Sequence, residues 1–391
     1  MSDLGTLATL RLPDDAAGIL TSRHPWIYRD HLPESHRIPD GSWVRVEAGR
    51  AVAFGLYDAE GAIAIRLFDW DAQPDDAWWK AAVTAAVRRR DGVAAEGHTA
   101  YRLLFGEGDG LPGIVADRYG RFAVIEPYAR SVEPFLPLVA RTLLREVRLK
   151  GVVRRHGSEL EVLAGEPPPP EETIRENGLR FLVNFTAGQK TGLFLDHREH
   201  RALVRDVSAG LRVLNLFAYT GGFSVHALAG GAREVWSVDT SAGALADAVR
   251  NVALNDLPAE RHRVLDEDVF ALLPHLEEAG ERFDLVILDP PSLARRKAQR
   301  ARAEAAYRRL NAAAAHLVTP GGMLATASCT AQVPAKAFDA AVKAGLREAG
   351  RSASLRVKSG HAPDHPVRKR FPEGAYLKFR LLDLDCEAPS A

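Results

Sequence analysis

The sequence predicts an α/β fold, and two observations carry that prediction. Residues 211–240 read as a β-strand, a glycine turn, a helix, a second strand and an acidic residue. Short apolar runs that end in a polar residue then recur up to residue 330, with helical stretches between them. Strands that alternate with helices form a parallel sheet, and a glycine turn after the first strand is typical of nucleotide-binding sheets. The expected architecture is a Rossmann-like domain over residues 186–391, preceded by two smaller domains.

Residues 1–75 are expected to form a small β-barrel. Turn residues such as Pro39-Asp40-Gly41 separate its β-type runs, which lie at 8–12, 43–46, 51–57 and 62–68. The segment Arg23-His24-Pro25-Trp26-Ile27-Tyr28 resembles the opening motif of PUA domains, which bind RNA. The sequence leaves open whether this PUA-like barrel contacts RNA directly or serves as a packing scaffold.

Residues 76–185 are expected to form a central α+β domain that links the other two. An Ala-rich amphipathic stretch at 75–90 predicts a helix. The glycine-dense loop within 103–120 lacks the lysine and the following helix of a phosphate-binding loop, so it predicts a hairpin instead. The remaining predicted elements are a helix at 134–147 and strands at 151–156, 160–163 and 179–183.

The turn Thr220-Gly221-Gly222 predicts a site for a nucleoside. Its glycines let the backbone approach a ligand because no Cβ intervenes. Asp239 follows Gly221 by 18 residues, close to the spacing of about 20 at which an acid accepts ribose hydroxyls. The dinucleotide fingerprint G-x-G-x-x-G is absent, which favours S-adenosylmethionine (SAM) over NAD. A βαβ unit that binds no ligand is the alternative.

Cofactor-binding residues are expected at the ends of the predicted strands, where doubly wound sheets place their ligands. After a strand at 263–265, Asp268 and Val269 offer a carboxylate for the exocyclic amine of adenine and an apolar side chain for its ring. The segment 187–201 is either an ordinary helix-capping loop or a flap that faces the cofactor. The full set is Asn215, Phe217, Ala218, Tyr219, Thr220, Gly221, Gly222, Asp239, Thr240, Asp268, Val269 and Asp289, with Gln189, Phe194 and Asp196 from the flap.

Asp289 and Cys329 are the candidate catalytic residues, since each follows a predicted strand, at 283–288 and at 323–327. A thiolate that adds to carbon 6 of a pyrimidine makes carbon 5 nucleophilic, and Asp289 at N3 would stabilise the charge that develops on the ring. Methylation of an adenine amino group at Asp289 is an alternative, weakened because Ser292 stands where an aromatic residue is usual. A buried structural role for Cys329 is the other alternative.

Together these motifs resemble the bacterial ribosomal RNA large subunit methyltransferase I family. The resemblance is carried by His24-Pro25-Trp26, the loop at 106–120, Gly188-Gln189-Lys190-Thr191-Gly192, residues 215–222, Asp289-Pro290-Pro291 and Ser328-Cys329. It implies a PUA domain, a linking domain and a class I methyltransferase domain that uses SAM to make 5-methylcytosine in 23S ribosomal RNA (rRNA). It also implies that Cys329 is the nucleophile.

Two groups needed for product release are less well defined by this resemblance. Related carbon-5 pyrimidine enzymes often carry a second cysteine that assists release, and this chain has Ser292 at that place. The releasing group is therefore unidentified. Glu373, in the segment 371–378, is a candidate base for the carbon-5 proton.

The charge and the cysteine content of the chain limit its possible binding partners and its cellular location. The formal net charge is zero, so affinity for RNA must come from local clusters. The candidates are Arg295, Arg296 and Lys297, and Arg368, Lys369 and Arg370; solvated charged surfaces are the alternative. Two cysteines, and no apolar run like a signal peptide or a membrane span, predict a cytoplasmic protein, and no metal site is expected.

Three rival functions stay open at this point. A 5-methyluridine enzyme would use the same thiolate addition. A non-catalytic SAM-binding assembly factor would keep the fold without the chemistry. An NAD-dependent dehydrogenase is disfavoured by the missing fingerprint. The sequence leaves the oligomeric state open, homodimer included.

Overall fold

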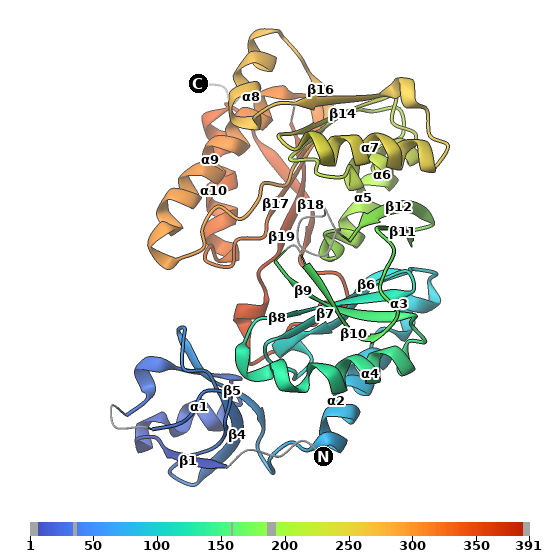
Figure 1. The fold of residues 1–391 in the computed structure, drawn as a ribbon. Helices are drawn as coiled ribbons and strands as arrows, with labels where there is room; N and C mark the ends of the chain where they lie inside the picture. The colour runs from blue at the N-terminus through green and yellow to red at the C-terminus, as the bar shows by residue number, and fades with distance from the viewer. Residues whose placement is uncertain (1–6, 34–36, 158, 186–192, 386–391) are drawn as a thin grey trace. The chain divides into compact units, whose positions relative to one another are not determined.

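The computed structural model describes residues 7–33, 37–157, 159–185 and 193–385. The chain divides into two compact units, which are described separately (Figure 1). The first unit comprises Met1–Arg175, Val183–Leu195 and Pro363–Gly374, and the second comprises Glu176–Leu182, Asp196–Ala362 and Ala375–Ala391. The chain therefore enters each unit more than once. The domain boundaries expected at 75 and 185 stay a prediction.

The first unit begins with the β-barrel segment. Its five strands form one sheet in the order β1-β3-β4-β5-β2. Val44 and Val46 of β3 are fully buried in one core with Leu20 of α1, because alternate residues of a strand face the same side. The strands β1, β3, β4 and β5 confirm the predicted runs, and β2 lies in the PUA-like motif. The elements are β1 (Ala8–Arg11), α1 (Ala17–Thr21), β2 (Trp26–Tyr28), β3 (Trp43–Ala48), β4 (Ala51–Tyr57) and β5 (Ile63–Asp69).

A second five-stranded sheet in the first unit has the order β10-β9-β8-β7-β6. Strands β6 and β7 are antiparallel and flank the glycine-dense loop, so the predicted hairpin is confirmed. Asp109 of this loop is buried and accepts two hydrogen bonds from Arg90, each 2.7 Å long. The elements are α2 (Asp76–Arg88), α3 (Asp91–Ala95), β6 (Ala100–Phe105), β7 (Ile114–Tyr119), β8 (Phe122–Pro127), α4 (Leu136–Glu146), β9 (Gly151–His156) and β10 (Glu159–Gly165).

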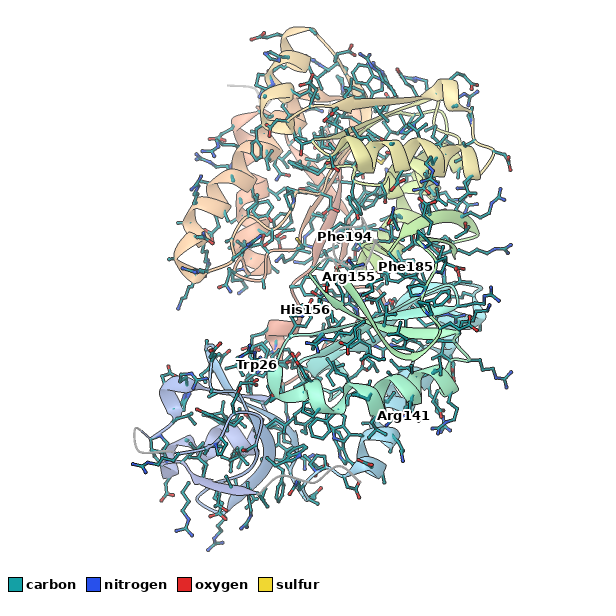
Figure 2. The ribbon with its side chains drawn as sticks, in the orientation of Figure 1. Trp26, Arg141, Arg155, His156, Phe185 and Phe194 are labelled. Carbon is teal, nitrogen blue, oxygen red and sulfur yellow. The ribbon has the colours of Figure 1, made fainter. Side chains whose placement is uncertain are left out.

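The chain leaves the first unit and returns to it through a small hairpin, β11 (Glu171–Glu176) and β12 (Leu179–Asn184). Phe185, at the return, is fully buried, and its ring lies 6.1 Å from that of Phe122. Its carbonyl accepts a hydrogen bond of 2.9 Å from Nη2 of Arg155 (Figure 2). This anchor fixes the chain to the sheet of the first unit immediately before residue 186.

The second unit is built on a seven-stranded sheet of order β15-β14-β13-β16-β17-β19-β18. The first five strands in this order, from β15 at the edge to β17, are parallel to one another. Strand β19 is antiparallel to both of its neighbours. This is the predicted Rossmann-like sheet with an antiparallel edge. The strands are β13 (Arg212–Leu216), β14 (Glu234–Asp239), β15 (His262–Asp266), β16 (Phe283–Leu288), β17 (Val318–Ser328), β18 (Ala353–Ser359) and β19 (Lys378–Leu384).

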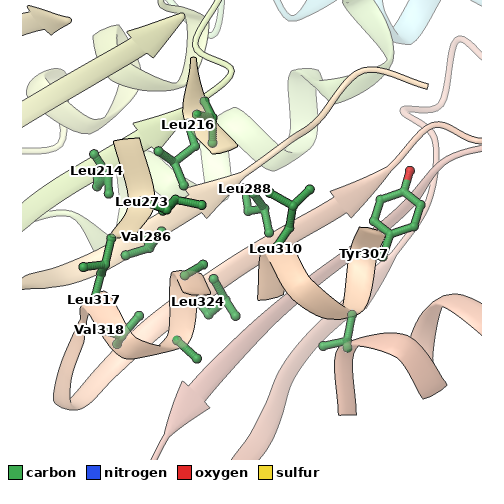
Figure 3. Packing of buried hydrophobic residues seen from close by; sticks show 14 of the residues in the cluster. Leu214, Leu216, Leu273, Val286, Leu288, Tyr307, Leu310, Leu317, Val318 and Leu324 are labelled. Atoms are coloured by element: carbon green, nitrogen blue, oxygen red, sulfur yellow. The ribbon is translucent and has the colours of Figure 1, made fainter. Parts of the chain in front are cut away.

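Helices cover both faces of this sheet (Figure 1). On one face, Leu216, Leu288 and Leu324 of the strands pack with Leu310 of α9 and Leu273 of α8 in one buried core (Figure 3). Helices α5, α6 and α7 cover the other face. The bounds are α5 (Arg198–Val207), α6 (Gly222–Ala229), α7 (Ala242–Leu254), α8 (Val269–Glu278), α9 (Arg300–Leu317) and α10 (Ala335–Glu348).

Four elements of the second unit, α8, α10, β18 and β19, go beyond the sequence prediction. Helix α8 contains Pro274, which normally argues against a helix. The strand predicted at 323–327 begins earlier, at Val318, because a bulge shifts its pairing with β16. Among the described residues, no helix is both long enough and apolar enough to cross a membrane.

Candidate active site

The candidate site lies at one edge of the sheet of the second unit. Strands β13, β14, β15, β16 and β17 are parallel, so their carboxyl ends lie at the same edge of the sheet. Sheets of this type hold their ligands at that edge. Asp239 is the last residue of β14, Asp289 follows β16 and Cys329 follows β17. The structure therefore brings these three predicted residues to one edge.

The turn after β13 is shaped by its backbone. Phe217, Tyr219 and Gly221 have positive φ angles of 61°, 49° and 76°, which is uncommon for residues with a side chain. A Cβ on Gly221 would lie 2.7 Å from the Cβ of Ala248 in α7. Only glycine fits there, so the turn packs closely on α7 and leaves its other side to a ligand.

Asp239 joins the turn from the end of β14. Its Oδ2 accepts the N–H of Tyr219 at 2.8 Å, and its Oδ1 accepts the N–H of Ser241 at 3.0 Å. Each carboxylate oxygen offers more than one lone-pair site, so both oxygens can also accept a hydroxyl. A ribose with two hydroxyls fits this acid, and the nucleoside of SAM fits the acid and the turn together.

Two predicted cofactor residues already have protein partners. Asn215 is 1% exposed, and its Nδ2 donates to Oγ of Ser224 at 2.8 Å. Its Oδ1 is buried with no hydrogen-bond partner among the described residues, so it offers an acceptor to a ligand. Asp268 caps α8 and accepts the N–H of Ala271 at 3.0 Å, which gives its carboxylate a structural role. Of the other predicted residues, Ala218, Thr220, Gly222 and Val269 are buried and Thr240 is exposed.

Cys329 is presented between two anchored neighbours. Ser328 and Thr330 are fully buried, whereas Cys329 is partly exposed. The Thr330 hydroxyl lies 2.7 Å from that of Tyr307 and accepts the N–H of Leu293 at 3.1 Å. These bonds tie the Cys329 loop to α9 and to the segment after Asp289, so the thiol is held in place while its surface stays accessible.

Lys378 lies beside the same loop, and the sequence interpretation missed it. Its Nζ donates to the carbonyls of Thr330 at 2.7 Å and Val333 at 3.0 Å. The side chain is buried, and burial lowers the pKa of Lys378 to about 8; the neighbouring Arg380 also lowers it, while Cys329 acts in the opposite direction. The available signal was one lysine at the start of an apolar strand.

Asp289 has a histidine partner that the sequence interpretation also missed. The Nε2 of His197 lies 3.4 Å from Oδ1 of Asp289. Burial would lower the pKa of His197, but the charge of Asp289 and its hydrogen bond outweigh burial and raise that pKa above its usual value. His197 follows Asp196 within the predicted flap. Only tertiary structure shows that it faces Asp289, because the two residues are distant in sequence.

A buried histidine pair extends from Asp289. The Nδ1 of His197 and the Nδ1 of His200 are 2.9 Å apart, and Nε2 of His200 lies 2.9 Å from Oγ of Ser359. Burial and the charge of His197 lower the pKa of His200 to about 2. His200 is therefore neutral, and its Nδ1 can accept a hydrogen bond from the Nδ1–H of His197, while His197 keeps its charge beside Asp289.

The rest of the predicted flap is placed only in part. Asp196 belongs to the second unit, where its Oδ2 accepts a hydrogen bond of 2.7 Å from the hydroxyl of Tyr376. Phe194 belongs to the first unit. Gln189 lies outside the described residues.

The predicted base Glu373 belongs to the first unit, and Cys329 belongs to the second. Oε1 of Glu373 lies 3.5 Å from Nε2 of His24, in the PUA-like motif. The nearby ring of Phe371 lies 4.6 Å from that of Trp26 in an edge contact. The segment 363–374 is thus packed onto the barrel.

The predicted cluster Arg368, Lys369 and Arg370 lines a groove of about 470 Å³ in the first unit. Arg23 and Trp70 of the barrel line the same groove, and the guanidinium of Arg23 lies 5.6 Å from the centre of the Trp70 ring. Burial, the charge of Arg89 and that of Arg23 lower the pKa of Arg368, although two carboxylates oppose them. Asp69 and Asp71 also line the groove, so four cations and two carboxylates lie beside its aromatic surface. Arg295, Arg296 and Lys297 are exposed in the second unit, shortly after Asp289.

Comparisons with known proteins agree with this geometry. A family profile described as S-adenosylmethionine-dependent methyltransferase matches residues 136–367, and one described as a PUA-like domain matches residues 10–70. A ribosomal RNA large subunit methyltransferase of Deinococcus radiodurans is 39% identical, over 96% of this chain and 97% of its own length. The ribosomal RNA large subunit methyltransferase I of Aeromonas salmonicida is 37% identical, over 92% and 95%. This chain belongs to the ribosomal RNA large subunit methyltransferase I family.

Solved structures share the fold of this family member. SMU.776, a methyltransferase in complex with SAH, has a TM-score of 0.87 at 22% identity, over 96% of this chain and 100% of its own. A chain described as a SAM-dependent methyltransferase from Streptococcus mutans has a TM-score of 0.85 at 21% identity, with the same coverage. The predicted family, the α/β fold with its PUA-like segment and the use of SAM are confirmed.

Proposed function

We propose that this methyltransferase I family member transfers a methyl group from SAM to carbon 5 of a cytosine in large subunit rRNA. The names of its relatives and the PUA-like segment support rRNA as the substrate. The observation that carries the chemistry is the partly exposed Cys329, held between buried neighbours at the edge that also carries Asp289.

Cys329 supplies the nucleophile in this proposal. Its thiolate forms a bond to carbon 6 of the ring, and the displaced electron pair makes carbon 5 nucleophilic. SAM supplies an electrophilic methyl group, which carbon 5 takes. Loss of the carbon-5 proton then returns the electron pair, and the bond between sulfur and carbon 6 breaks. The enzyme is left with its thiolate, ready for the next base.

The pair of His197 and Asp289 supplies a proton to the ring. The pair holds one proton at the site because the pKa of His197 is raised by the charge of Asp289, against the effect of burial. We assign delivery of that proton to N3 through Asp289 as the sulfur bond forms, and its return when the bond breaks. Glu373 stays a prediction for the carbon-5 proton, and its contact with His24 gives that role no support.

Trapping of a covalent adduct tests the proposal. Fluorine at carbon 5 cannot leave as a proton, so RNA that carries 5-fluorocytosine should form an adduct that survives denaturing gels and maps to Cys329. Cys329→Ser should lose methylation and trapping together while it still binds SAM, because a hydroxyl is barely ionised at neutral pH. Cys386→Ser is the matched control and should keep both activities.

Three results would contradict the proposal. Methylation by the Cys329→Ser variant would remove the nucleophile and favour an amino-group mechanism at Asp289. An adduct on another residue would do the same. Nucleoside mass spectrometry that finds 5-methyluridine in the treated rRNA, with no 5-methylcytosine, would replace cytosine by uridine as the substrate base.

We also propose that the groove of the first unit and the cluster at 295–297 bind RNA phosphates. Four cationic side chains line the groove: Arg23, Arg368, Lys369 and Arg370. Among the residues that the structure describes, none of the four forms an ion pair. Cations that line a groove together with a partly buried aromatic ring are typical of single-stranded RNA sites, where phosphates bind the cations and bases stack on the ring.

A further inference from the structure

We infer that Lys378 is a positioning residue for the reaction: its ammonium group holds the Cys329 sulfur in the thiolate form. The inference rests on the proposed function, because a thiolate is needed only if Cys329 attacks the base. Lys378 opens β19 and pairs with Ser328 of β17 across the sheet. It therefore lies directly opposite the residue that precedes the nucleophile.

Strand pairing and hydrogen bonds place Lys378 beside the residues on both sides of Cys329 in the sequence. Strand pairing sets Lys378 against Ser328, and its Nζ donates to the carbonyls of Thr330 and Val333 at 2.7 Å and 3.0 Å. An ammonium group has three N–H donors. Two are used by the carbonyls of Thr330 and Val333, which leaves a third donor.

The charge of Lys378 is buried without a carboxylate partner. The residue is 4% exposed, and among the described residues no Asp or Glu oxygen lies within 4.0 Å of its Nζ. Its neighbour Arg380 is occupied by Asp339, at 2.7 Å. A buried ammonium without a counter-charge is unfavourable. The Cys329 sulfur can supply that counter-charge as a thiolate, and its charge opposes the effect of burial on the pKa of Lys378.

The other titratable groups around this loop do not fill that role. Tyr307 contacts Thr330 from α9, and burial raises its pKa to about 12, so it is neutral in the physiological range. Asp289 is paired with His197. The thiolate of Cys329 is thus the anion that matches Lys378.

The stabilisation works in both directions. If a thiolate stabilises the ammonium group, the ammonium group stabilises the thiolate by the same free energy. An ordinary cysteine has a pKa of about 8.5 and is mostly protonated at neutral pH, although only the thiolate is nucleophilic. Lys378 therefore increases the fraction of Cys329 that is ready to add to the base.

The test measures the thiol directly. In a Cys386→Ser background, Cys329 is the one cysteine left, and its alkylation by iodoacetamide can be followed by mass spectrometry across a pH series. The midpoint of the rate profile should lie below about 8.5 in the parent protein. Lys378→Met should raise it, and each unit of increase slows alkylation about ten-fold at pH values below both midpoints. Lys378→Arg should keep the low midpoint.

Lys358→Met is the matched control, since Lys358 is an exposed lysine of the neighbouring strand β18 and pairs with Asp339. It should leave the midpoint unchanged. A parent midpoint at or above about 8.5 overturns the inference without any variant, so the test holds even if Lys378→Met fails to fold. Three further outcomes would also overturn the inference. They are an unshifted midpoint in Lys378→Met, a raised midpoint in Lys378→Arg, and a shift in Lys358→Met equal to that in Lys378→Met.

Failure of this inference can be told from failure of the proposed function. A low parent midpoint that rises in Lys378→Met, combined with no trapping by 5-fluorocytosine RNA, supports the thiolate and contradicts the methylation chemistry. Normal trapping at Cys329 with an unshifted midpoint supports the chemistry and removes Lys378 from it.

Discussion

Asp239 combines a structural and a predicted binding role in one carboxylate. Its oxygens fix the N–H groups of Tyr219 and Ser241, and the same oxygens are expected to hold the ribose of SAM. Asp239→Ala should weaken SAM binding by about 1.5–3 kcal/mol, the range for hydrogen bonds to a charged group. Isothermal calorimetry checks this. Affinity equal to that of the parent protein would remove Asp239 from the cofactor site.

We expect His226 to make the second unit sensitive to acid. It is fully buried, with Nδ1 2.8 Å from the Gly222 carbonyl and Nε2 3.2 Å from Nδ2 of Asn177. A carbonyl only accepts, so Nδ1 carries the proton and Nε2 accepts from Asn177, which makes the ring neutral. Burial lowers the pKa of His226 to about 4, although Glu176 opposes it.

The sign of the pH effect follows from that lowered pKa. The unfolded chain takes up the proton near pH 6.5, before the folded one does, so the contribution of His226 is fully present above about 6.5 and is lost as the pH falls toward about 4. The free energy of unfolding should decrease over this range by up to about 3 kcal/mol from His226 alone. Urea denaturation at a series of pH values should show a shallower slope for His226→Gln. His275→Gln, at an exposed position, should keep the parent slope; equal slopes in both variants would contradict the assignment.

At the scale of the element, the turn between β13 and α6 depends on one glycine. Gly221→Ala places a Cβ 2.7 Å from that of Ala248, at a φ of 76°. We expect a loss of about 2 kcal/mol or more in unfolding free energy, because both overpacking and backbone strain oppose the change. Weakened SAM binding should accompany it.

Gly243→Ala is the matched control for this turn. Gly243 lies in α7, and a Cβ added there would have no neighbouring atom within 4 Å. Alanine also favours a helix over glycine by about 0.5–1 kcal/mol. Chemical denaturation should therefore show a neutral or stabilising effect. If both variants lost the same unfolding free energy, the region would tolerate no added Cβ at either position. The requirement for glycine would then not be specific to Gly221.

Local sequence patterns predicted the helices and strands that are determined by their own residues. Strands β4, β9 and β16 have the bounds that their β-type and apolar runs indicated. Helix α8 was missed because Pro274 is a local signal against a helix, while its Asp268 cap and its buried face stabilise it. Strands β18 and β19 complete the sheet through long-range pairing, which periodicity alone does not show.

The same distinction holds for the site. The placement of Asp289 and Cys329 at one edge of the sheet could be predicted because both follow parallel strands, whose ends are a predictable place for a ligand. Lys378 and His197 could not, because each is defined by a partner far away in the chain. The roles assigned to Asn215, Asp268 and Glu373 stay predictions, and the structure gives each of them a protein contact that the sequence did not indicate.

At the scale of the whole molecule, zero net charge means that RNA binding depends on local clusters. Replacing Arg368, Lys369 and Arg370 by Ala should weaken RNA binding and flatten its dependence on salt, by about 0.7–0.9 log units for each phosphate that the variant no longer binds. The same change at Arg295, Arg296 and Lys297 should act likewise. Filter binding over a salt series measures both, and SAM affinity should stay unchanged.

The control for these clusters is a third set of exposed cations on α10, Lys336, Lys343 and Arg347. Their replacement by Ala should leave the salt dependence as it is in the parent protein. If this set flattens the salt dependence as much as the groove cluster does, RNA binding is diffuse and the groove is not a site. If none of the three sets changes it, both predicted clusters are merely solvated.

The position of β19 constrains how the protein is made. Residues 378–384 lie between β17 and β18 in the sheet, although they are synthesised after both. When synthesis has just reached the end of β18, the nascent chain contains Cys329 but lacks β19, the strand that carries Lys378. Its site can therefore be completed only after residues 378–384 have been made and have inserted between the two older strands.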